Sequence, residues 1–362
     1  MTSTNQGLPT NFILPICIAC KIKLIFPGLL LFLVSTTASS PLSCASLPPR
    51  VLLREAHMLS LDPSTLPGTW TSARCETRPG PQFVLRRYTF HSVNGSILSP
   101  VGDLVSGVVY HYADPSCSQP LHSITMQGSL TIRDQSWLVP GGTEADFKLL
   151  HVWVRPYIKG VALKAQKKVA KVCPELGEVP WRTGEDYSVY TEGGKEDCLD
   201  ALSLAFWEFQ LFKLEQGMDG LEGSHPHHPR LLLGDLHSQA SKRRKYRPTA
   251  YQPDHLVKYD EKHHTRTCRL VHNSSPSDPP QLRVSPTIPV NHKALAGSWH
   301  STRCEVRPHS LFITRMITFS KDNHWRGEFK FFLDHFCSNP HFSVNVTGRY
   351  IKGETRHHYQ YK

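Results

Sequence analysis

The sequence lacks the signatures of several common protein classes. It has no Gly-x-y repeat and no long heptad run, which excludes collagen and coiled coils. It contains no GxSxG, HExxH, P-loop or GxGxxG motif, so it offers no familiar catalytic or nucleotide-binding constellation. Beyond the first 34 residues no apolar run reaches the ~20 residues that a membrane-spanning helix needs, at the C-terminal end included. We expect a protein that is not an enzyme and that carries no metal or cofactor.

Strong charge is also missing. The formal net charge of +11 is moderate for 362 residues and favours acidic partners such as sulfated glycans; we expect no nucleic-acid partner. The basic cluster Lys242–Lys245 is interpreted first as a solvated loop and second as a glycan contact. The 39% of hydrophobic residues is sufficient for a packed core, so wholesale disorder is not expected.

The N-terminus has the order of a secretory signal. Lys21 and Lys23 precede the apolar run 24–34, and small residues follow at 35–40. We interpret residues 1–40 as a signal peptide that directs the chain to the secretory pathway and the cell exterior or surface. The alternative is a membrane anchor near residues 12–34, which its lysines and prolines disfavour.

The cysteines beyond this leader form no CxxC pair, so zinc-ribbon and thioredoxin interpretations lack support. In a secreted chain disulfides are the default. The candidates for disulfide bonding are Cys75, Cys117, Cys173, Cys198, Cys304 and Cys337. Cys268 is either unpaired or joined to Cys44. The sequons at Asn94, Asn273 and Asn345 predict glycosylation.

An internal repeat is the most informative feature. Residues 68–90 and 297–319 are identical at 12 of 23 positions, and similarity continues around Cys117 and Cys337. Without a nine-residue insertion in the first copy, both copies space their two cysteines equally. Cys75–Cys117 and Cys304–Cys337 are thus the same structural pair twice, although sequence does not fix which cysteines bond.

Alternating apolar residues predict that strands dominate this repeat. Strands are expected at 83–90, 108–112, 123–133, 146–154 and 208–215, and helices at 160–172 and 197–207. We predict an α+β fold, mainly antiparallel β, made of a duplicated open β-barrel-like module with packed helices. The first module spans 65–272, a Pro-rich linker 273–292, and an incomplete second module 293–362.

Four residues of one predicted strand share a face, namely Val84, Arg86, Tyr88 and Phe90. They are candidates for the lining of a lipid pocket, with ordinary core as the favoured alternative. Glu76 and Arg86 recur as Glu305 and Arg315. We expect each pair to be a structural ion pair; the alternative is an arginine that lines a binding cavity.

Several motifs together resemble the adenomatosis polyposis coli down-regulated protein family, and the stretch Cys198-Leu199-x-Ala201-Leu202 is closer to its "like" paralogue. They cover about residues 68–350 and comprise the repeat core Trp70…Cys75-Glu76-x-Arg78-Pro79…Arg86-x-Tyr88-x-Phe90, and the stretches 136–139, 141–146, 233–237 and 246–253. The resemblance implies tandem open antiparallel barrels in a secretory-pathway glycoprotein that antagonises Wnt signalling at the cell surface. Family members end in a C-terminal membrane anchor and a full second module, which this sequence does not show.

The resemblance also implies partners, namely a Wnt ligand and the Wnt co-receptor. Because a Wnt ligand carries a fatty acyl chain, an apolar barrel is expected to shelter that chain. The alternative function is a general extracellular lipid-binding carrier.

Overall fold

The computed structural model describes residues 23–25, 60–91, 103–139, 141–216, 228–262, 264–283, 295–301, 303–309 and 311–351. The fold is mainly antiparallel β with few helices, which confirms the predicted fold class. Within these residues, no helix has the length and apolar character needed to cross a membrane.

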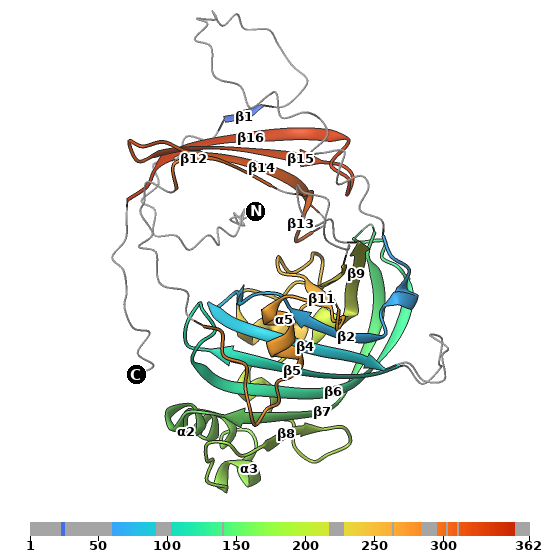
Figure 1. Ribbon diagram of the computed structural model, residues 1–362, viewed down its shortest axis with the longest axis vertical. Helices are drawn as coiled ribbons and strands as arrows, with labels where there is room; N and C mark the ends of the chain where they lie inside the picture. Colours follow the sequence, from blue (N-terminus) through green and yellow to red (C-terminus); the bar gives the residue numbers. More distant parts are fainter. Residues whose placement is uncertain are drawn as a thin grey trace, which may run out of the picture.

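The first copy of the repeat forms an eight-stranded barrel. Its strands are β2 (Gly68–Ser72), β4 (Gln82–His91), β5 (Asp103–Tyr112), β6 (Pro120–Gln135), β7 (Thr143–Pro156), β9 (Leu211–Gln216), β10 (Pro229–Leu233) and β11 (Leu256–Lys258). They pair in the order β2-β11-β10-β9-β7-β6-β5-β4, and β2 pairs again with β4, so the ring of hydrogen bonds closes (Figure 1). The predicted open barrel is therefore closed in this copy, although only two residue pairs join β7 to β9. Two short strands, β3 (Glu76–Arg78) and β8 (Tyr187–Thr191), extend β4 and β7.

Alternation along the strands separates the interior from the outer wall. On β4, Val84, Tyr88 and Phe90 belong to the interior core, whereas Leu85 faces an outer cluster. That outer cluster also contains Val271 of the helix α5 (Arg266–His272), which lies against the barrel wall. The period-2 pattern read from the sequence is thus the pattern of a barrel wall that is covered on both faces.

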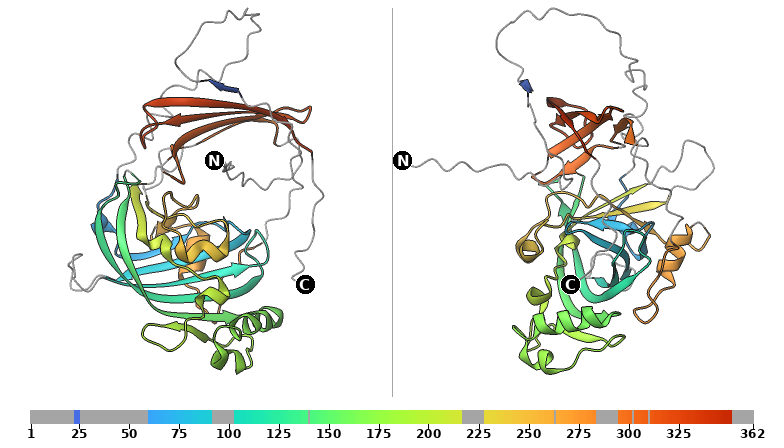
Figure 2. Two further views of the ribbon diagram at one scale, coloured as in Figure 1. Left: turned by 180° about the vertical axis from the view of Figure 1, so that it is seen from behind. Right: turned by 90° about the vertical axis from the view of Figure 1, so that its left-hand side faces the viewer.

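Helices close one end of the barrel. Figure 1 and Figure 2 show α2 (Lys159–Val169), α3 (Pro174–Glu178) and β8 together at that end. The buried residues Ala162, Ala165 and Val169 fall on one face of α2, as helical spacing requires.

The helix expected at 197–207 is shorter than predicted. Only α4 (Leu199–Leu202) forms, because Ser203 adopts a left-handed conformation (φ 57°) that ends it. The 3₁₀ helix η3 (Trp207–Gln210) follows and leads into β9, which begins three residues later than expected.

The second copy forms an open sheet. Its strands are β12 (Gly297–His300), β13 (Glu305–Arg307), β14 (Leu311–Phe319), β15 (His324–Phe332) and β16 (Pro340–Arg349), with β1 (Lys23–Ile25) paired to β16. All views place this sheet across the end of the barrel opposite α2 (Figures 1 and 2). The equivalent tryptophans of the two copies show the difference between a closed barrel and an open sheet. Trp70 is fully buried, whereas Trp299 is 54% exposed.

Three disulfides join the six predicted cysteines. They are Cys75–Cys117, Cys173–Cys198 and Cys304–Cys337, so each repeat carries its pair internally. Among the described residues Cys268 is a free, buried thiol on α5, and Thr265 donates a hydrogen bond to it. Cys44, its alternative partner, lies outside the described residues.

The first part of the predicted linker lies on the barrel. Tyr112 donates to the carbonyl of Pro280, Tyr157 to that of Pro276, and Leu282 N–H to that of Cys117. Residues 273–283 therefore pack on the first module instead of extending away from it.

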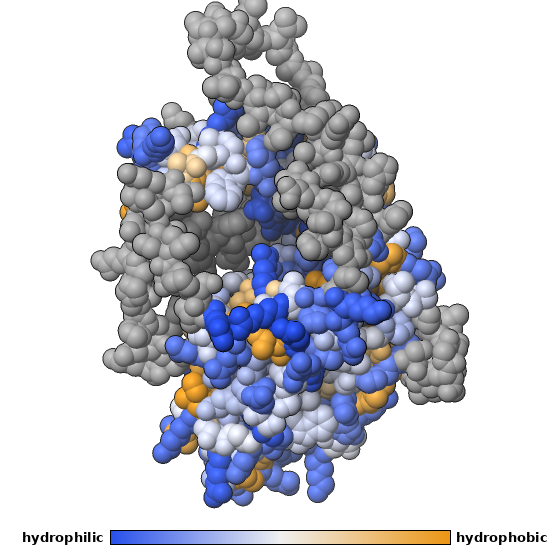
Figure 3. Space-filling model, in the orientation of Figure 1, coloured by the Kyte–Doolittle hydropathy of each residue, from blue (hydrophilic) through white to orange (hydrophobic). Residues whose placement is uncertain are grey.

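The outer surface is mostly polar. Figure 3 shows a largely hydrophilic face with separate small hydrophobic patches over the coloured residues. Most large apolar side chains of the first copy lie inside the barrel or under α5.

Candidate functional site

A hydrogen-bonded triad lies inside the first barrel, near the end that faces the second sheet. Ser72 donates to Glu76 Oε1 at 2.5 Å and accepts from the Arg86 backbone N–H at 2.7 Å. The Arg86 guanidinium holds the same carboxylate, with Nη2 2.7 Å from Glu76 Oε2. Both charged side chains are at most 2% exposed, so this is a fully desolvated ion pair.

The second copy repeats this triad. Ser301 donates to Glu305 Oε1 at 2.6 Å and accepts from Arg315 N–H at 2.8 Å, while Arg315 Nε lies 2.7 Å from Glu305 Oε1. The expectation of a structural ion pair in each copy is confirmed. Here, however, the Arg315 side chain is 30% exposed, because no closed barrel surrounds it.

A second carboxylate enters the first barrel from η3. The Glu208 side chain is 3% exposed, and its nearest ion-pair partner is Arg78, whose Nη2 lies 3.9 Å from Glu208 Oε1. That separation is too long for a hydrogen bond. Burial raises the pKa of Glu208, and the positive charges of Arg78, Arg86 and Arg243 oppose that rise.

Several polar atoms around Glu208 have no hydrogen-bond partner among the described residues. They are Arg78 Nε and Nη2, Arg86 Nη1, the Tyr88 hydroxyl and Glu208 Oε2. Burial also raises the pKa of Tyr88 to about 12, so its hydroxyl stays protonated. Gln252 Oε1 nearby is unpaired as well, so this end of the barrel holds both buried donors and buried acceptors without hydrogen-bond partners among the described residues.

Next to this polar group the interior is apolar and filled. The Phe209 ring lies 4.9 Å from Tyr88 and 4.7 Å from Phe147, measured between centroids, and contacts Phe90 edge-on. The predicted lipid-lining residues Val84, Arg86, Tyr88 and Phe90 all face this interior. They stay candidates for a lipid pocket, in a space that Phe209 occupies.

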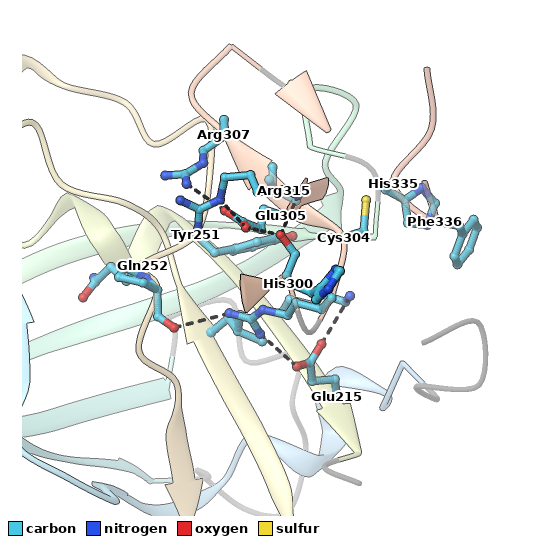
Figure 4. Close-up of a pocket in the computed structure, with 16 residues that line it drawn as sticks. Glu215, Tyr251, Gln252, His300, Cys304, Glu305, Arg307, Arg315, His335 and Phe336 are labelled. Carbon is cyan, nitrogen blue, oxygen red and sulfur yellow. Dashed lines mark hydrogen bonds and ion pairs between the residues drawn. The ribbon is translucent and has the colours of Figure 1, made fainter. Parts of the chain in front are cut away.

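A cavity of about 380 Å³ separates the barrel from the second sheet (Figure 4). Arg303 crosses it, with Nη1 3.4 Å from Glu215 Oε1 of β9 and Nη2 bonded to the Pro253 carbonyl. The open triad of Glu305 and Arg315 lines the same cavity. Arg315 thus lines a cavity, and the alternative weighed for the recurring pair, an arginine that lines a binding cavity, stays a prediction.

A smaller cavity of about 170 Å³ reaches the polar end of the barrel. Its lining includes Glu76 and Arg78 from the barrel, Gln252 and Asp254 from the segment before β11, and Arg307 from the second sheet. Arg78 therefore lies between the barrel interior and a cavity that opens towards solvent.

The basic cluster 242–245 is not a solvated loop, which corrects the first interpretation. It forms the 3₁₀ helix η4 (Ala240–Lys245). Arg243 is 7% exposed and donates to the Pro79 and His237 carbonyls and to Gln82, while Arg244 pairs with Asp197 and Asp200. Two of the four charges are thus used inside the fold.

The sequons lie in different settings. Asn273 is exposed and directly follows α5, Asn345 lies within β16, and Asn94 falls outside the described residues. Glycosylation at the three sites stays a prediction.

One aromatic contact differs between the copies at equivalent positions. His111 and His122 stack at 4.5 Å on β5 and β6, and Phe331 and Phe342 stack at 4.4 Å on β15 and β16. Burial lowers the pKa of His122 to about 4, with a further contribution from Lys168, and also lowers the pKa of His111. The first copy thus has neutral imidazoles where the second has phenyl rings.

Comparison with protein families agrees with this repeat structure. The family model described as adenomatosis polyposis coli down-regulated 1 matches residues 46–283 and 285–357. The chain belongs to this family. The match covers the barrel and the open sheet, so the duplicated triad and the two repeated disulfides lie within the part shared with the adenomatosis polyposis coli down-regulated family.

Sequence reasoning missed Glu208, Phe209 and Arg243 as interior residues. The apolar alternation of 208–215 placed Glu208 on a strand, whereas a 3₁₀ turn carries it into the barrel. The sequence did contain a signal for Arg78 as a site residue, because the equivalent position of the second copy is also an arginine, Arg307.

Proposed function

We propose that the protein binds a Wnt ligand outside the cell and inhibits Wnt signalling. The family match over most of the chain is the observation that carries this proposal. Three disulfides support a compartment outside the cytosol, where a Wnt ligand is met. Binding of the Wnt co-receptor belongs to the same proposal. Sequestration of a ligand needs no chemistry, which agrees with a protein that is not an enzyme.

In the finer form of the proposal, an apolar barrel interior shelters the Wnt acyl chain. The support is the apolar lining of the first barrel, formed by residues such as Val84, Tyr88, Phe90, Met126 and Phe147. Each buried methylene contributes about 0.8 kcal/mol, so a fatty chain supplies much of the affinity. Because Phe209 fills this space, the chain must displace η3 or lie on the open second sheet.

Pull-down with the full secreted chain tests both forms. We expect acylated Wnt to be retained at least tenfold better than the same Wnt without its acyl group. Equal retention of the two would refute acyl sheltering and leave Wnt binding intact. No retention of either, with the chain folded and disulfide-bonded, would refute Wnt binding.

A general extracellular lipid carrier is the second candidate. It is favoured by one observation, the unpaired buried polar atoms beside the apolar interior, which suit a lipid with a free polar head. Retention of fatty acid without retention of Wnt would support it.

Sulfated glycans are a further proposed partner. Lys242 and Lys245 stay exposed on η4 and supply the positive surface for this contact. Loss of heparin retention on replacing both lysines by glutamine is the expected outcome, with the double replacement of Lys159 and Lys164 as the matched control.

A further inference from the structure

The cavity between the barrel and the second sheet is lined by more cations than carboxylates. Its charged lining residues are Lys213, Glu215, Arg303, Glu305, Arg307 and Arg315. Four cations thus accompany two carboxylates, an excess of two positive charges when the lining histidines are counted as neutral. No residue of η4 is among them, so this excess is separate from the glycan contact proposed there.

Two arginines of the second sheet share one carboxylate. Arg307 Nη2 lies 2.7 Å from Glu305 Oε2, and Arg315 Nε lies 2.7 Å from Glu305 Oε1 (Figure 4). Burial lowers the pKa of Arg307, Glu305 opposes this fall, and the positive charge of Arg315 adds to it. One of the two guanidinium charges therefore has no carboxylate of its own.

The first copy has an additional carboxylate at this position. Arg78 is the equivalent of Arg307, and its ion-pair partner is the buried Glu208 of η3, 3.9 Å away. In the second copy, the ion-pair partner of Arg307 among the described residues is Glu305, which Arg315 already holds. The repeat thus conserves the pair of arginines in both copies but a second carboxylate in the first copy alone.

The carboxylates of the neighbouring smaller cavity are engaged elsewhere. They are Glu76, which pairs with Arg86, Asp235, which accepts from the Tyr246 hydroxyl, and Asp254, which pairs with Arg74. Although Arg307 also lines that cavity, none of the three forms an ion pair with it among the described residues.

The other carboxylate of the large cavity is also shared. Lys213 Nζ and Arg303 Nη1 each lie 3.4 Å from an oxygen of Glu215, which is 2% exposed. Charge-assisted hydrogen bonds are usually about 2.7–2.9 Å long, so neither cation is held closely. Because Lys213 belongs to β9 and Arg303 to the second sheet, the excess charge lies where barrel and sheet meet.

Unpaired neutral groups accompany the cations. The Tyr251 hydroxyl and Gln252 Oε1 belong to residues that line the cavity, and neither atom has a hydrogen-bond partner among the described residues. Burial, with a smaller contribution from Glu215, raises the pKa of Tyr251, so its hydroxyl stays a donor at neutral pH. A ligand that carries anionic oxygens and a hydroxyl group would satisfy both atoms.

We propose that this cavity binds a divalent tetrahedral oxyanion, as free phosphate or sulfate or as the sulfate group of a sugar. Its two negative charges balance the excess, and its oxygens accept hydrogen bonds from Arg307, Arg303 and Lys213. The planar donor fork of arginine matches such oxygens. A cavity of about 380 Å³ leaves room for the anion and for water, which takes about 30 Å³ per molecule. The bound anion links the barrel to the second sheet, a role that does not depend on Wnt binding.

Calorimetric titration of the full secreted chain with sodium sulfate, phosphate and chloride at equal ionic strength tests the site. We expect sulfate or phosphate to bind at least about tenfold more tightly than chloride. Arg303→Gln and Arg307→Gln should each weaken that binding by about tenfold, because each removes a charged donor. Arg326→Gln is the matched control, since Arg326 is exposed on β15 and does not line the cavity.

A sulfated disaccharide and its desulfated form identify the source of the anion. Binding of the sulfated sugar that exceeds sulfate by about tenfold, is lost in Arg307→Gln and persists in Lys242→Gln/Lys245→Gln would assign the site to a glycan. Comparable or weaker binding of the sugar would assign it to the free anion. If sulfate, phosphate and the sulfated sugar all bind no better than chloride, or bind equally to both cavity variants, the site is refuted.

Hydrogen exchange keeps the test decisive if an arginine variant does not fold. Saturating sulfate should slow exchange in β13 of the unmodified chain relative to chloride at the same ionic strength, because the anion ties this strand to the barrel. Exchange in β13 that is unchanged or faster with bound sulfate would overturn the proposed link between barrel and sheet.

Discussion

The two copies of the repeat build the same Ser–Glu–Arg triad in two different settings. In the first copy the sheet closes and seals the Glu76–Arg86 pair at 1–2% exposure. In the second copy the sheet is open, and the equivalent Glu305–Arg315 pair lies at 17–30% exposure beside a cavity. The local hydrogen bonds are nearly identical, so they are set by the repeat sequence itself. What differs is the environment, and the environment decides how much each interaction contributes to stability.

The largest difference is expected at the repeat tryptophans. Trp70→Ala should lower the free energy of unfolding by ~3–5 kcal/mol, because a fully buried ring and its hydrogen bond to the Leu66 carbonyl are lost. Trp299→Ala should cost less than ~1 kcal/mol, because that ring is 54% exposed. Urea unfolding of both variants measures the difference. Equal effects would show that the second sheet is covered in solution.

The triad gives the next largest contrast. Arg86→Met should destabilise the barrel by about 3 kcal/mol, the low end for breaking a buried pair, because Ser72 still donates to the stranded carboxylate. Arg315→Met should cost about 0–1 kcal/mol, since solvent reaches the remaining Glu305. The same urea titration reports both values. A costly Arg315→Met would contradict the view that burial, and not the triad geometry, determines the energy.

Of the two stacked aromatic pairs, only the His111–His122 pair of the first copy can titrate, so it predicts a stability that depends on pH. The folded-state pKa of His122 is about 4, below its unfolded value, so stability is complete above pH ~6.5 and falls as pH drops towards 4. Lowering the pH from 7 to 5 should cost about 1–2 kcal/mol through this residue. The variant His111→Phe/His122→Phe copies the second repeat and should remove that loss. Thermal unfolding at both pH values tests it, and an unchanged pH dependence would assign the effect to other groups.

The smallest effects on stability are expected at Arg74 and Arg303, the arginines that directly precede the first disulfide-bonded cysteine of each copy. Arg74 is 76% exposed and pairs with Asp254, so Arg74→Ala should cost about 0–1 kcal/mol. Arg303 instead links the second sheet to the buried Glu215. Arg303→Ala should leave the barrel transition within about 1 kcal/mol, because Lys213 still pairs with Glu215, and should speed hydrogen exchange in β13. Unchanged exchange there would show that Arg303 does not hold the sheet in place.

The sequence predicted the parts of this fold that depend on local pattern. Alternation located β4 and β7 closely, and the repeat identified both ion pairs and four of the six bonded cysteines. Cys173 and Cys198 were candidates only because disulfides are the default in a secreted chain. Closure of the barrel was not predictable in this way. It depends on β2 pairing with both β4 and β11, and the short β11 carries almost no periodic signal.

The residues of the interior site were not predicted from the sequence for a related reason. Glu208 and Phe209 are brought inside by a four-residue 3₁₀ turn, and such turns have no periodicity long enough to detect. Arg243 was read as part of a charged loop because composition alone does not show that its guanidinium meets the Pro79 carbonyl. Long-range contacts of single side chains are the part of a structure that sequence pattern describes least.

The pairing of β2 with β11 also determines when the barrel can close during synthesis of the chain. Ser72 of the first barrel strand meets Leu256 of the last one, so the ring stays incomplete until nearly the whole first module has been made. At a synthesis rate of roughly 5–20 residues per second, β2 waits about 10–40 s for that neighbour. Contacts of such high sequence separation form slowly, and an unpaired strand edge is prone to wrong association during the wait. The nascent chain is therefore expected to depend on lumenal chaperones most strongly just before Leu256 emerges.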